Sequence, residues 1–427
     1  MAKHHKILVV SHFGGVGEMA QRFLMEGHEV KFCITDPPSR DINDGLIKKV
    51  KHWEPWVEWS DLVVFDDTRF SKQAEACRAQ GKAVVGPTEY GDQLELDRGF
   101  GQAEFKKAGM TTVPDWTFKS LDEAIKFVQQ NPARYVAKPD GKASDEKALT
   151  YVGKNEDGSD VVTILESYKK KWAAKIKSIE LQLFIKGVEV AVGGFFNGKE
   201  FIQPIFINSE YKKFLNNDLG PNCGEAGETA FWLHGGRIYQ ETLEKMTAPL
   251  RASGYTGYFD LNLIATKDAL YSLEATSRFG YPPIWLQMES IKSGLGDFFY
   301  ALGAGDRFKL DTESGFICCV VCTVAPYPFE DPEGFKKYAE GKKVEFKDPS
   351  LGGIYLSDVK QVDGEWVLAG NSGYAVICVG LGQTMSEAKE NVYERVKSVS
   401  IPDMAYRTDI GHRWDKDRDK LQAWSWL

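Results

Sequence analysis

The sequence lacks any hydrophobic run long enough to cross a membrane. Its longest apolar stretch, residues 316–325, falls far short of the ~20 residues that a spanning helix needs. The first apolar run, residues 7–10, has only the length of a strand, and we expect no secretory segment. These features predict a cytoplasmic protein without a membrane partner.

The sequence also has no surplus of positive charge and few cysteines. Its 53 basic and 61 acidic residues give a net charge of −8, which leaves no electrostatic footprint for nucleic acid. Its 7 cysteines are too scattered for a disulfide framework, and an odd count favours free thiols in a reducing compartment. Cys318, Cys319 and Cys322 lie in an apolar stretch, where buried thiols are expected rather than a zinc site. The hydrophobic fraction of 43% excludes a disordered chain, and 427 residues predict about two to four domains.

The first 96 residues have the pattern of an α/β domain. Strand-like apolar runs alternate with helical stretches, which predicts a parallel sheet covered on both faces. The expected strands are residues 7–11, 30–35, 61–65 and 83–85, and the first expected helix is residues 19–25.

After residue 96 the pattern changes. Asn197-Gly198 indicates a hairpin in an antiparallel sheet. A long polar loop is expected over residues 208–229, and a third, strand-rich region begins near residue 316. The other expected elements are a helix at residues 99–108 and strands at 135–138, 178–184, 188–197, 201–207, 257–264 and 270–275.

A glycine-rich segment follows the first expected strand. Gly15, Gly17 and Ala20 match a pattern that lets a helix N-terminus approach a phosphate. Asp36 lies about where an acidic residue would bind a ribose. Taken alone, this pattern predicts a dinucleotide site, as in an NAD(P)-dependent oxidoreductase. The alternative is that the glycines only let the helix pack on the sheet.

A second group combines lysines with carboxylates. Lys138 ends an expected strand, and Asp260 and Glu274 lie on two later strands joined by a turn at residues 266–268. Antiparallel pairing would bring the two carboxylates together, and such oxygen ligands suit a Mg²⁺ ion that is shared with phosphate groups. The alternative is a set of solvated acids at strand ends and surface lysines.

Three strings, in order along the chain, resemble the ATP-grasp superfamily and, within it, the glycinamide ribonucleotide synthetase family. Residues 218–224 read DLGPNCG, similar to the family's D-x-G-P-N-T-G. Residues 274–280 read EATSRFG, similar to E-x-N-x-R-F-G, and residues 406–411 read YRTDIG, the family's closing string. The order and spacing hold over nearly the whole chain.

The resemblance implies a multidomain α/β and α+β fold. It implies a Rossmann-like pre-ATP-grasp domain at residues 1–96, an ATP-grasp domain at 97–315 with a small lobe at about 112–188, and a C-terminal α+β domain at 316–427. The implied activity is that of an ATP-dependent ligase of purine biosynthesis that uses Mg²⁺ or Mn²⁺. It would join a small carboxylate, glycine or another amino acid, to an amine through an acyl phosphate. We expect no nucleic-acid partner, and a monomer or homodimer.

The resemblance also implies roles for individual residues. Arg278, and Lys147 in the phosphate loop, would act in catalysis. The implied metal ligands are Asp260, Glu274 and Thr276. The implied ATP contacts are Lys138 on phosphate, Gln182 on the adenine amino group, the backbone of Leu183 and Ile185, and Glu189 on the ribose. The implied substrate contacts are Gly15, Gly17, Asp218, Asn222 and Gly224.

The sequence departs from the family's pattern at several of these places. Thr276 replaces a metal-binding Asn, and the phosphate loop, KASDEK at residues 142–147, is more acidic and stiffer than the family's Gly- and Ala-rich loop. The segments that hold phosphoribosylamine in the family read GGVGE at residues 14–18 and DDTRF at residues 66–70, in place of G-G-R-E-H and G-P-E-x-P-L. We therefore expect a ligase with an altered acceptor site. The nearest alternative is glycinamide ribonucleotide synthesis itself. The others are a diverged, catalytically silent ATP-grasp binding protein and the oxidoreductase.

Overall fold

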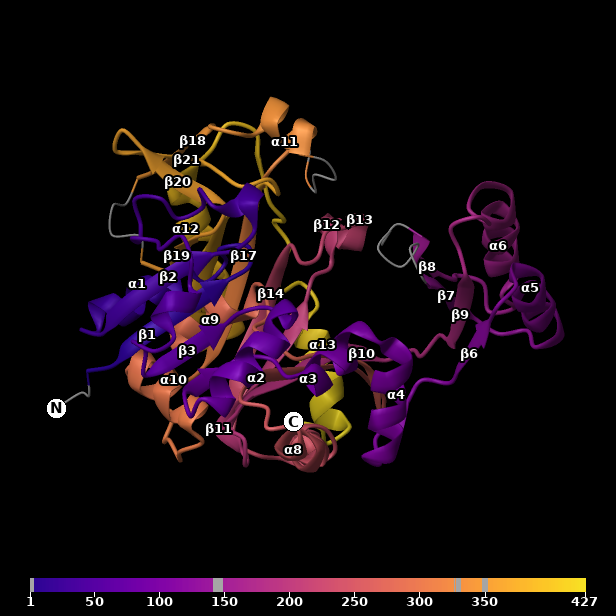
Figure 1. Ribbon diagram of the computed structural model, residues 1–427. Helices are drawn as coiled ribbons and strands as arrows, with labels where there is room; N and C mark the ends of the chain where they lie inside the picture. Colours follow the sequence, from indigo (N-terminus) through magenta and orange to yellow (C-terminus); the bar gives the residue numbers. More distant parts are fainter. Residues whose placement is uncertain (1–3, 141–148, 326, 328–331, 348–351) are drawn as a thin grey trace. The chain divides into compact units, whose positions relative to one another are not determined.

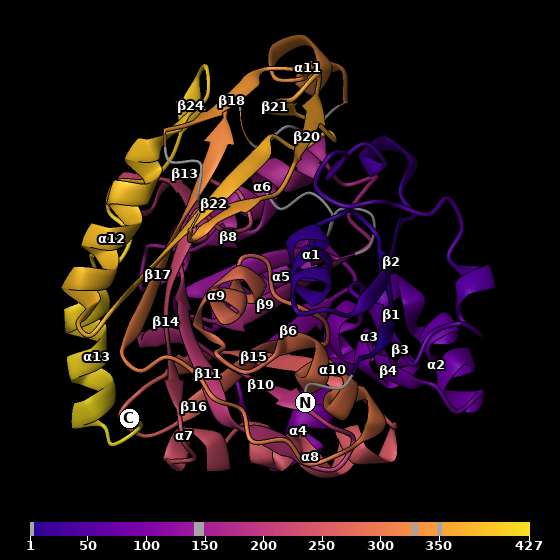
Figure 2. The same ribbon diagram turned by 90° about the vertical axis from the view of Figure 1, so that its left-hand side faces the viewer.

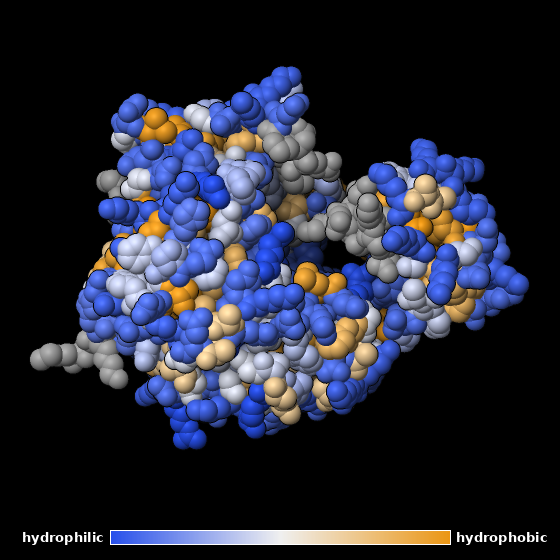
Figure 3. Space-filling model, viewed as in Figure 1, coloured by the Kyte–Doolittle hydropathy of each residue, from blue (hydrophilic) through white to orange (hydrophobic). Residues whose placement is uncertain are grey.

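The computed structural model describes residues 4–140, 149–325, 327, 332–347 and 352–427. The chain forms two compact units, and each is described separately below. The first comprises Met1–Met110, Glu189–Leu263 and Glu274–Leu427, and the second comprises Thr111–Val188 and Ile264–Leu273. No described helix is long and apolar enough to span a membrane. The face shown in Figure 3 is mostly hydrophilic, with scattered hydrophobic patches.

The first unit begins with a four-stranded parallel sheet in the order β2-β1-β3-β4 (Figure 1). Its central strands consist of buried aliphatic residues, as expected for a parallel sheet covered on both faces. This arrangement confirms the predicted Rossmann-like domain. Its elements are β1 (Lys6–Ser11), α1 (Gly17–Met25), β2 (Glu29–Ile34), β3 (Leu62–Phe65), α2 (Ser71–Ala79), β4 (Ala83–Val85), α3 (Glu89–Leu96) and α4 (Arg98–Lys107).

A large, mainly antiparallel sheet forms the centre of the first unit, with strands in the order β19-β22-β17-β14-β11-β10-β15-β16. The predicted hairpin is present, since Phe196 pairs with Phe201 across a turn in which Gly198 has a φ of +84°. The strands are β10 (Val188–Phe196), β11 (Phe201–Glu210), β14 (Gly227–Leu233), β15 (Gly257–Ala265), β16 (Leu270–Thr276), β17 (Phe316–Val324), β19 (Ile354–Leu356) and β22 (Tyr374–Gly382). The helices between them are α7 (Arg237–Gln240), α8 (Leu243–Ala252), α9 (Pro283–Ser290) and α10 (Leu295–Ala304).

The C-terminal region adds a second small sheet and two long helices to the first unit. Figure 2 shows α12 alongside β17 and β22, and a capping box between Thr384 and Glu387 starts this helix. Trp426, near the C-terminus, packs on its own chain, with the Arg237 guanidinium 3.8 Å from the centre of its ring. The elements are α11 (Pro332–Tyr338), β18 (Lys343–Phe346), β20 (Val359–Val362), β21 (Glu365–Leu368), α12 (Met385–Ser398), β23 (Val399–Ser400), β24 (Met404–Ala405) and α13 (Trp414–Ala423).

The second unit is a four-stranded sheet in the order β6-β9-β7-β8, with two helices that lie side by side (Figure 1). Its separate hydrophobic core includes Tyr135, Leu165 and Leu181. The elements are β5 (Thr111–Thr112), β6 (Asp115–Phe118), α5 (Leu121–Gln130), β7 (Tyr135–Asp140), β8 (Tyr151–Val152), α6 (Ser159–Lys171) and β9 (Ser178–Leu183).

Two sequence interpretations can be checked directly. The three neighbouring cysteines are buried free thiols in β17, which confirms the interpretation of that stretch. The prediction of a polar loop over residues 208–229 is wrong, because β11 runs on to Glu210 and β14 already begins at Gly227. Between them, β12 (Lys213–Leu215) pairs with β13 (Leu219–Asn222), so polar composition concealed a short hairpin whose turn residues have positive φ angles.

Candidate functional site

The two predicted metal carboxylates lie within electrostatic reach of each other in the first unit. Asp260, on β15, is buried, and its Oδ2 accepts a hydrogen bond of 3.2 Å from the hydroxyl of Tyr258. Its Oδ1 has no hydrogen-bond partner among the described residues. Burial, the charge of Glu210 and the more weakly acting charge of Glu274 raise the pKa of Asp260 to about 7. A buried carboxylate with an unpaired oxygen and acidic neighbours fits a hard divalent cation.

Lys212, between β11 and β12, forms ion pairs with two acids of this group, Glu189 and Glu210, and the sequence analysis missed it. Its Nζ lies 2.7 Å from Oε1 of Glu189 and 3.0 Å from Oε2 of Glu210. Burial lowers the pKa of Lys212, but the charges of Glu210, Glu189 and Glu274 outweigh it and hold that pKa well above its usual value. For Glu189, burial opposes ionisation and Lys212 outweighs it, so the pKa of Glu189 is lowered. Lys212 therefore stays charged beside the candidate metal ligands.

Two further acids, Glu225 and Glu228, extend the acidic group. Burial and then the charge of Glu210 raise the pKa of each well above the usual value, and the charge of Asp260 adds to this. Glu228 accepts a hydrogen bond from the amide of Asn208. Each acid keeps one carboxylate oxygen without a partner among the described residues. Both lie in the stretch that was predicted to be a polar loop, so no pattern along the chain singled them out.

The described residues contain no group of three or more His, Cys, Asp or Glu side chains placed to hold a metal ion. The predicted ligand set has two carboxylates, and its third member is Thr276, at the end of β16. That set therefore stays a prediction, supported by the unpaired Oδ1 of Asp260.

Arg278 is fixed by a carboxylate that the sequence analysis did not single out. Its Nε donates to Oε1 of Glu95 over 3.0 Å, and its Nη1 donates to the carbonyl of Phe279 over 2.9 Å. Burial lowers the pKa of Arg278, but the charge of Glu95 outweighs it, so that pKa is raised. The other oxygen of Glu95 accepts from the backbone N–H of Ser277 over 2.8 Å. Glu95 thus holds both the guanidinium and the backbone before it.

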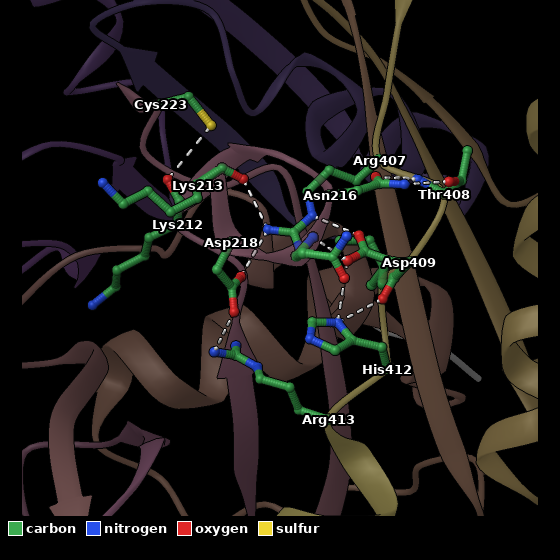
Figure 4. A network of polar contacts seen from close by, with 12 residues as sticks. Lys212, Lys213, Asn216, Asp218, Cys223, Arg407, Thr408, Asp409, His412 and Arg413 are labelled. Carbon is green, nitrogen blue, oxygen red and sulfur yellow. Dashed lines mark hydrogen bonds and ion pairs between the residues drawn. The ribbon is translucent and has the colours of Figure 1, made fainter. Parts of the chain in front are cut away.

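Asp218 belongs to a different network, shown in Figure 4. Its Oδ1 accepts from Nη1 of Arg407 over 2.9 Å, and its Oδ2 lies 3.4 Å from Nη1 of Arg413. Arg407 also binds Asp409 through two nitrogens, at 2.8 and 2.9 Å. This network joins the DLGPNCG string to the YRTDIG string. Asn222, in β13, is exposed.

Most of the predicted ATP contacts lie in the second unit, whereas Glu189 belongs to the first. Lys138, on β7, donates to Oε1 of Gln182, on β9, over 2.5 Å, so the structure brings these two together. The N–H of Leu183 already donates to the carbonyl of Pro114 over 2.9 Å. Ile185 follows β9 and is half-buried. Lys147 lies outside the described residues.

Gly15 lies between β1 and α1, and Gly17 is the first residue of α1. Protein side chains occupy the positions that Cβ atoms on these glycines would take. A Cβ atom on Gly17 would lie 2.2 Å from the Asn43 amide, and one on Gly15 would lie 2.7 Å from the Tyr281 ring. These glycines are therefore required for packing, as in the alternative stated for the glycine pattern.

Gly15 and Gly224 share a cavity of about 440 Å³ in the first unit, hereafter the acidic cavity. Asp66 and Asp358 lie in its wall. Burial raises the pKa of Asp66 to about 6, although hydrogen bonds from the Ser11 hydroxyl and the His12 N–H lower it in part. Burial also raises the pKa of Asp358 to about 7, although a hydrogen bond from Ser372 lowers it in part.

These pKa values predict a pH-dependent stability. The folded values exceed the unfolded value of 3.8, so the stabilisation is fully present below pH 3.8 and is lost as the pH rises through about 6 and about 7. Asp358→Asn stays neutral throughout, so its Tm relative to wild type is expected to increase from about pH 5 to about pH 8. Calorimetry of both proteins, with Asp415→Asn as a control at a side chain that is 86% exposed, measures this. A Tm difference that is constant with pH would contradict the account.

The comparisons with known proteins agree with this architecture. The family model described as "Phosphoribosylglycinamide synthetase, ATP-grasp (A) domain" matches residues 97–283, and the model described as "Phosphoribosylglycinamide synthetase, C domain" matches residues 317–413. The phosphoribosylamine–glycine ligase of Lactococcus lactis is 26% identical over 340 residues, which are 77% of this chain and 78% of that protein. That of Helicobacter pylori is 23% identical over 96% of this chain and 97% of its own.

A solved structure shows the same fold. The crystal structure of phosphoribosylamine–glycine ligase from Thermotoga maritima superposes with a TM-score of 0.71 at 22% identity, and covers 95% of this chain and 99% of its own. Two domain models of one family, matched in order over about two thirds of the chain, agree with this likeness. The chain therefore belongs to the phosphoribosylglycinamide synthetase family of ATP-grasp ligases.

Proposed function

We propose that the chain is an ATP-dependent carboxylate–amine ligase whose amine acceptor differs from phosphoribosylamine. The observation that supports it is that Asp260 and Glu274 lie within electrostatic reach of each other and of the Lys212 network, in a chain of this ligase family. The first unit keeps charged groups suited to phosphoryl transfer. By contrast, the segments that bind phosphoribosylamine in the family have different residues here.

The proposed reaction has two steps. A carboxylate oxygen of the substrate attacks the γ-phosphorus of ATP, the bond to the bridging oxygen breaks, and ADP leaves. The amine nitrogen then attacks the acyl carbon, phosphate leaves, and the nitrogen loses a proton. Mg²⁺, held by Asp260, Glu274 and Thr276, would neutralise charge on the transferring phosphoryl group. Arg278 would orient that group, and Lys138 would bind a phosphate of ATP.

Release of ADP tests this proposal. The assay uses ATP and Mg²⁺ with glycine and a panel of amino acids, each with phosphoribosylamine, with other amines, and with none. We expect ADP with an amino acid and an amine other than phosphoribosylamine. Formation of ADP only with glycine and phosphoribosylamine would contradict the altered acceptor. The absence of ADP with every pair, in folded protein that binds nucleotide, would favour the silent alternative.

Arg278 provides a second test of the proposed reaction. Arg278→Lys is expected to lower kcat about 100-fold, because a lysine lacks the planar fork that orients a phosphoryl group. Glu95→Gln is expected to lower kcat less, since it removes only the carboxylate that holds the guanidinium. The measurement is steady-state ADP release, with circular dichroism to verify the fold. A near-normal kcat for Arg278→Lys would show that Arg278 has a structural role.

A further inference from the structure

The acidic cavity differs in charge from a site for a phosphorylated ligand. Its volume of about 440 Å³ is in the range of small-molecule sites. Its wall contains the carboxylates of Asp66, Asp67, Glu225 and Asp358, and none of the described residues that line it is Lys, Arg or His. A phosphate group in this cavity would face carboxylates without a cation in the wall.

Two arginines lie near aromatic rings that line the cavity, and each forms an ion pair with an acidic residue. Arg69 lies 5.5 Å from the ring centre of Phe13 and pairs with Asp67 at 3.3 Å. Arg278 lies 6.0 Å from the ring centre of Tyr281 and pairs with Glu95. Neither arginine lines the cavity, so the described wall contributes carboxyl groups and no cationic side chain.

Aromatic rings supply the remainder of the wall. Tyr281, Trp285, Tyr374 and Tyr327 follow one another at ring-centre distances of 5.5, 6.1 and 6.4 Å. Carboxylates combined with the faces of aromatic rings recognise organic cations. The polar groups among them are not all satisfied. Trp285, only 1% exposed, has an Nε1 donor without a partner among the described residues.

Glu225 connects this cavity to the candidate metal carboxylates. It lines the cavity, and its Oε2 has no partner among the described residues. Burial and the charges of Glu210, Glu228 and Asp260 raise the pKa of Glu225, and the charge of Lys212, which does not line the cavity, lowers it. A ligand that pairs with Glu225 would therefore lie beside the acids proposed to serve phosphoryl transfer.

From the wall's carboxylates, its aromatic rings and its lack of described basic residues, we infer that the acidic cavity binds a phosphate-free organic cation of the aliphatic di- or polyamine class. One amino group, in its neutral form, serves as the acceptor nucleophile, while a second, protonated nitrogen is held by Asp358 and Glu225. The role as acceptor depends on the proposed ligase function. Binding itself does not.

Calorimetric titration of the full chain without ATP tests the inference. The probes are 1,4-diaminobutane, spermidine, 4-amino-1-butanol, which has a hydroxyl in place of the second amine, and ribose 5-phosphate. We expect the di- and polyamine to bind at least about tenfold more tightly than the amino alcohol, and ribose 5-phosphate to bind more weakly than either. Tighter binding of ribose 5-phosphate, or no binding of either amine, would overturn the inference.

Charge-removing variants locate the cation. Asp358→Asn and Glu225→Gln keep the side-chain shape, and each is expected to weaken amine binding about tenfold or more. Asp415→Asn, remote from the cavity, should bind the amines as wild type does. Amine affinity unchanged in both cavity variants would overturn the assignment. If the amines bind but no pair of substrates yields ADP, the cation site stands and the ligase function fails.

Discussion

Replacing Glu274 with alanine is expected to abolish ADP formation, with a loss of at least about 1,000-fold in kcat, while the fold stays intact. Glu274 lies at an exposed position on β16, so its removal leaves no buried gap. Its charge nevertheless acts on both Asp260 and Lys212, which places it at the candidate metal centre. ADP release and Mn²⁺ binding followed by electron paramagnetic resonance measure the two consequences.

A second variant at the same site and a control variant elsewhere complete this experiment. Asp260→Asn, which keeps the hydrogen-bond acceptor for Tyr258, is expected to lose metal binding and turnover as well. Glu365→Ala removes a carboxylate that is 59% exposed on a different sheet and should have no effect. Wild-type turnover in Glu274→Ala would contradict the metal assignment.

Replacing Arg407 with alanine is expected to lower the free energy of unfolding by about 3 kcal/mol. Arg407 is wholly buried and pairs with both Asp218 and Asp409, so its loss leaves two carboxylates without their main counter-charge (Figure 4). Arg407→Lys should be only partly tolerated, because one ammonium group cannot bind Asp409 through two nitrogens. Since the network anchors the hairpin of β12 and β13, substrate binding is expected to weaken as well.

Calorimetric unfolding measures this loss of stability. Arg418→Ala is a matched control, because Arg418 is 36% exposed and pairs with the 66%-exposed Asp419. Surface pairs of that kind contribute little. A Tm of Arg407→Ala equal to that of the control would show that the network does not hold the hairpin.

The sequence predicted the elements that have a periodic apolar pattern and the features that a short motif marks. Alternating apolar runs indicated the parallel sheet, and Asn197-Gly198 indicated a hairpin of the antiparallel sheet, because local chemistry sets both. Lys212 and Glu225 were missed because they lie among polar residues without periodicity, and only tertiary pairing brings them to Asp260. Asp218 was predicted from its string alone, which could not indicate that Arg407 would engage it.

The glycine pattern shows that a local motif does not report contacts with distant parts of the chain. Gly15 and Gly17 have the spacing of a phosphate site, yet the neighbours that require them are Tyr281 and Asn43. Asn43 is more than twenty residues away along the chain, and Tyr281 is more than two hundred. No local pattern reports contacts over such separations, so the acidic cavity could not have been inferred before the fold was known.

The central claim is that the chain uses ATP to activate a carboxylate. Trapping with hydroxylamine tests this most directly, because hydroxylamine converts an acyl phosphate to a hydroxamate whatever the natural amine is. With ATP, Mg²⁺ and a panel of amino acids, the account predicts hydroxamate and ADP in equal amounts for at least one amino acid, and neither product in Glu274→Ala. Folded, nucleotide-binding protein that yields no hydroxamate with any amino acid, or the same yield in Glu274→Ala, would contradict it.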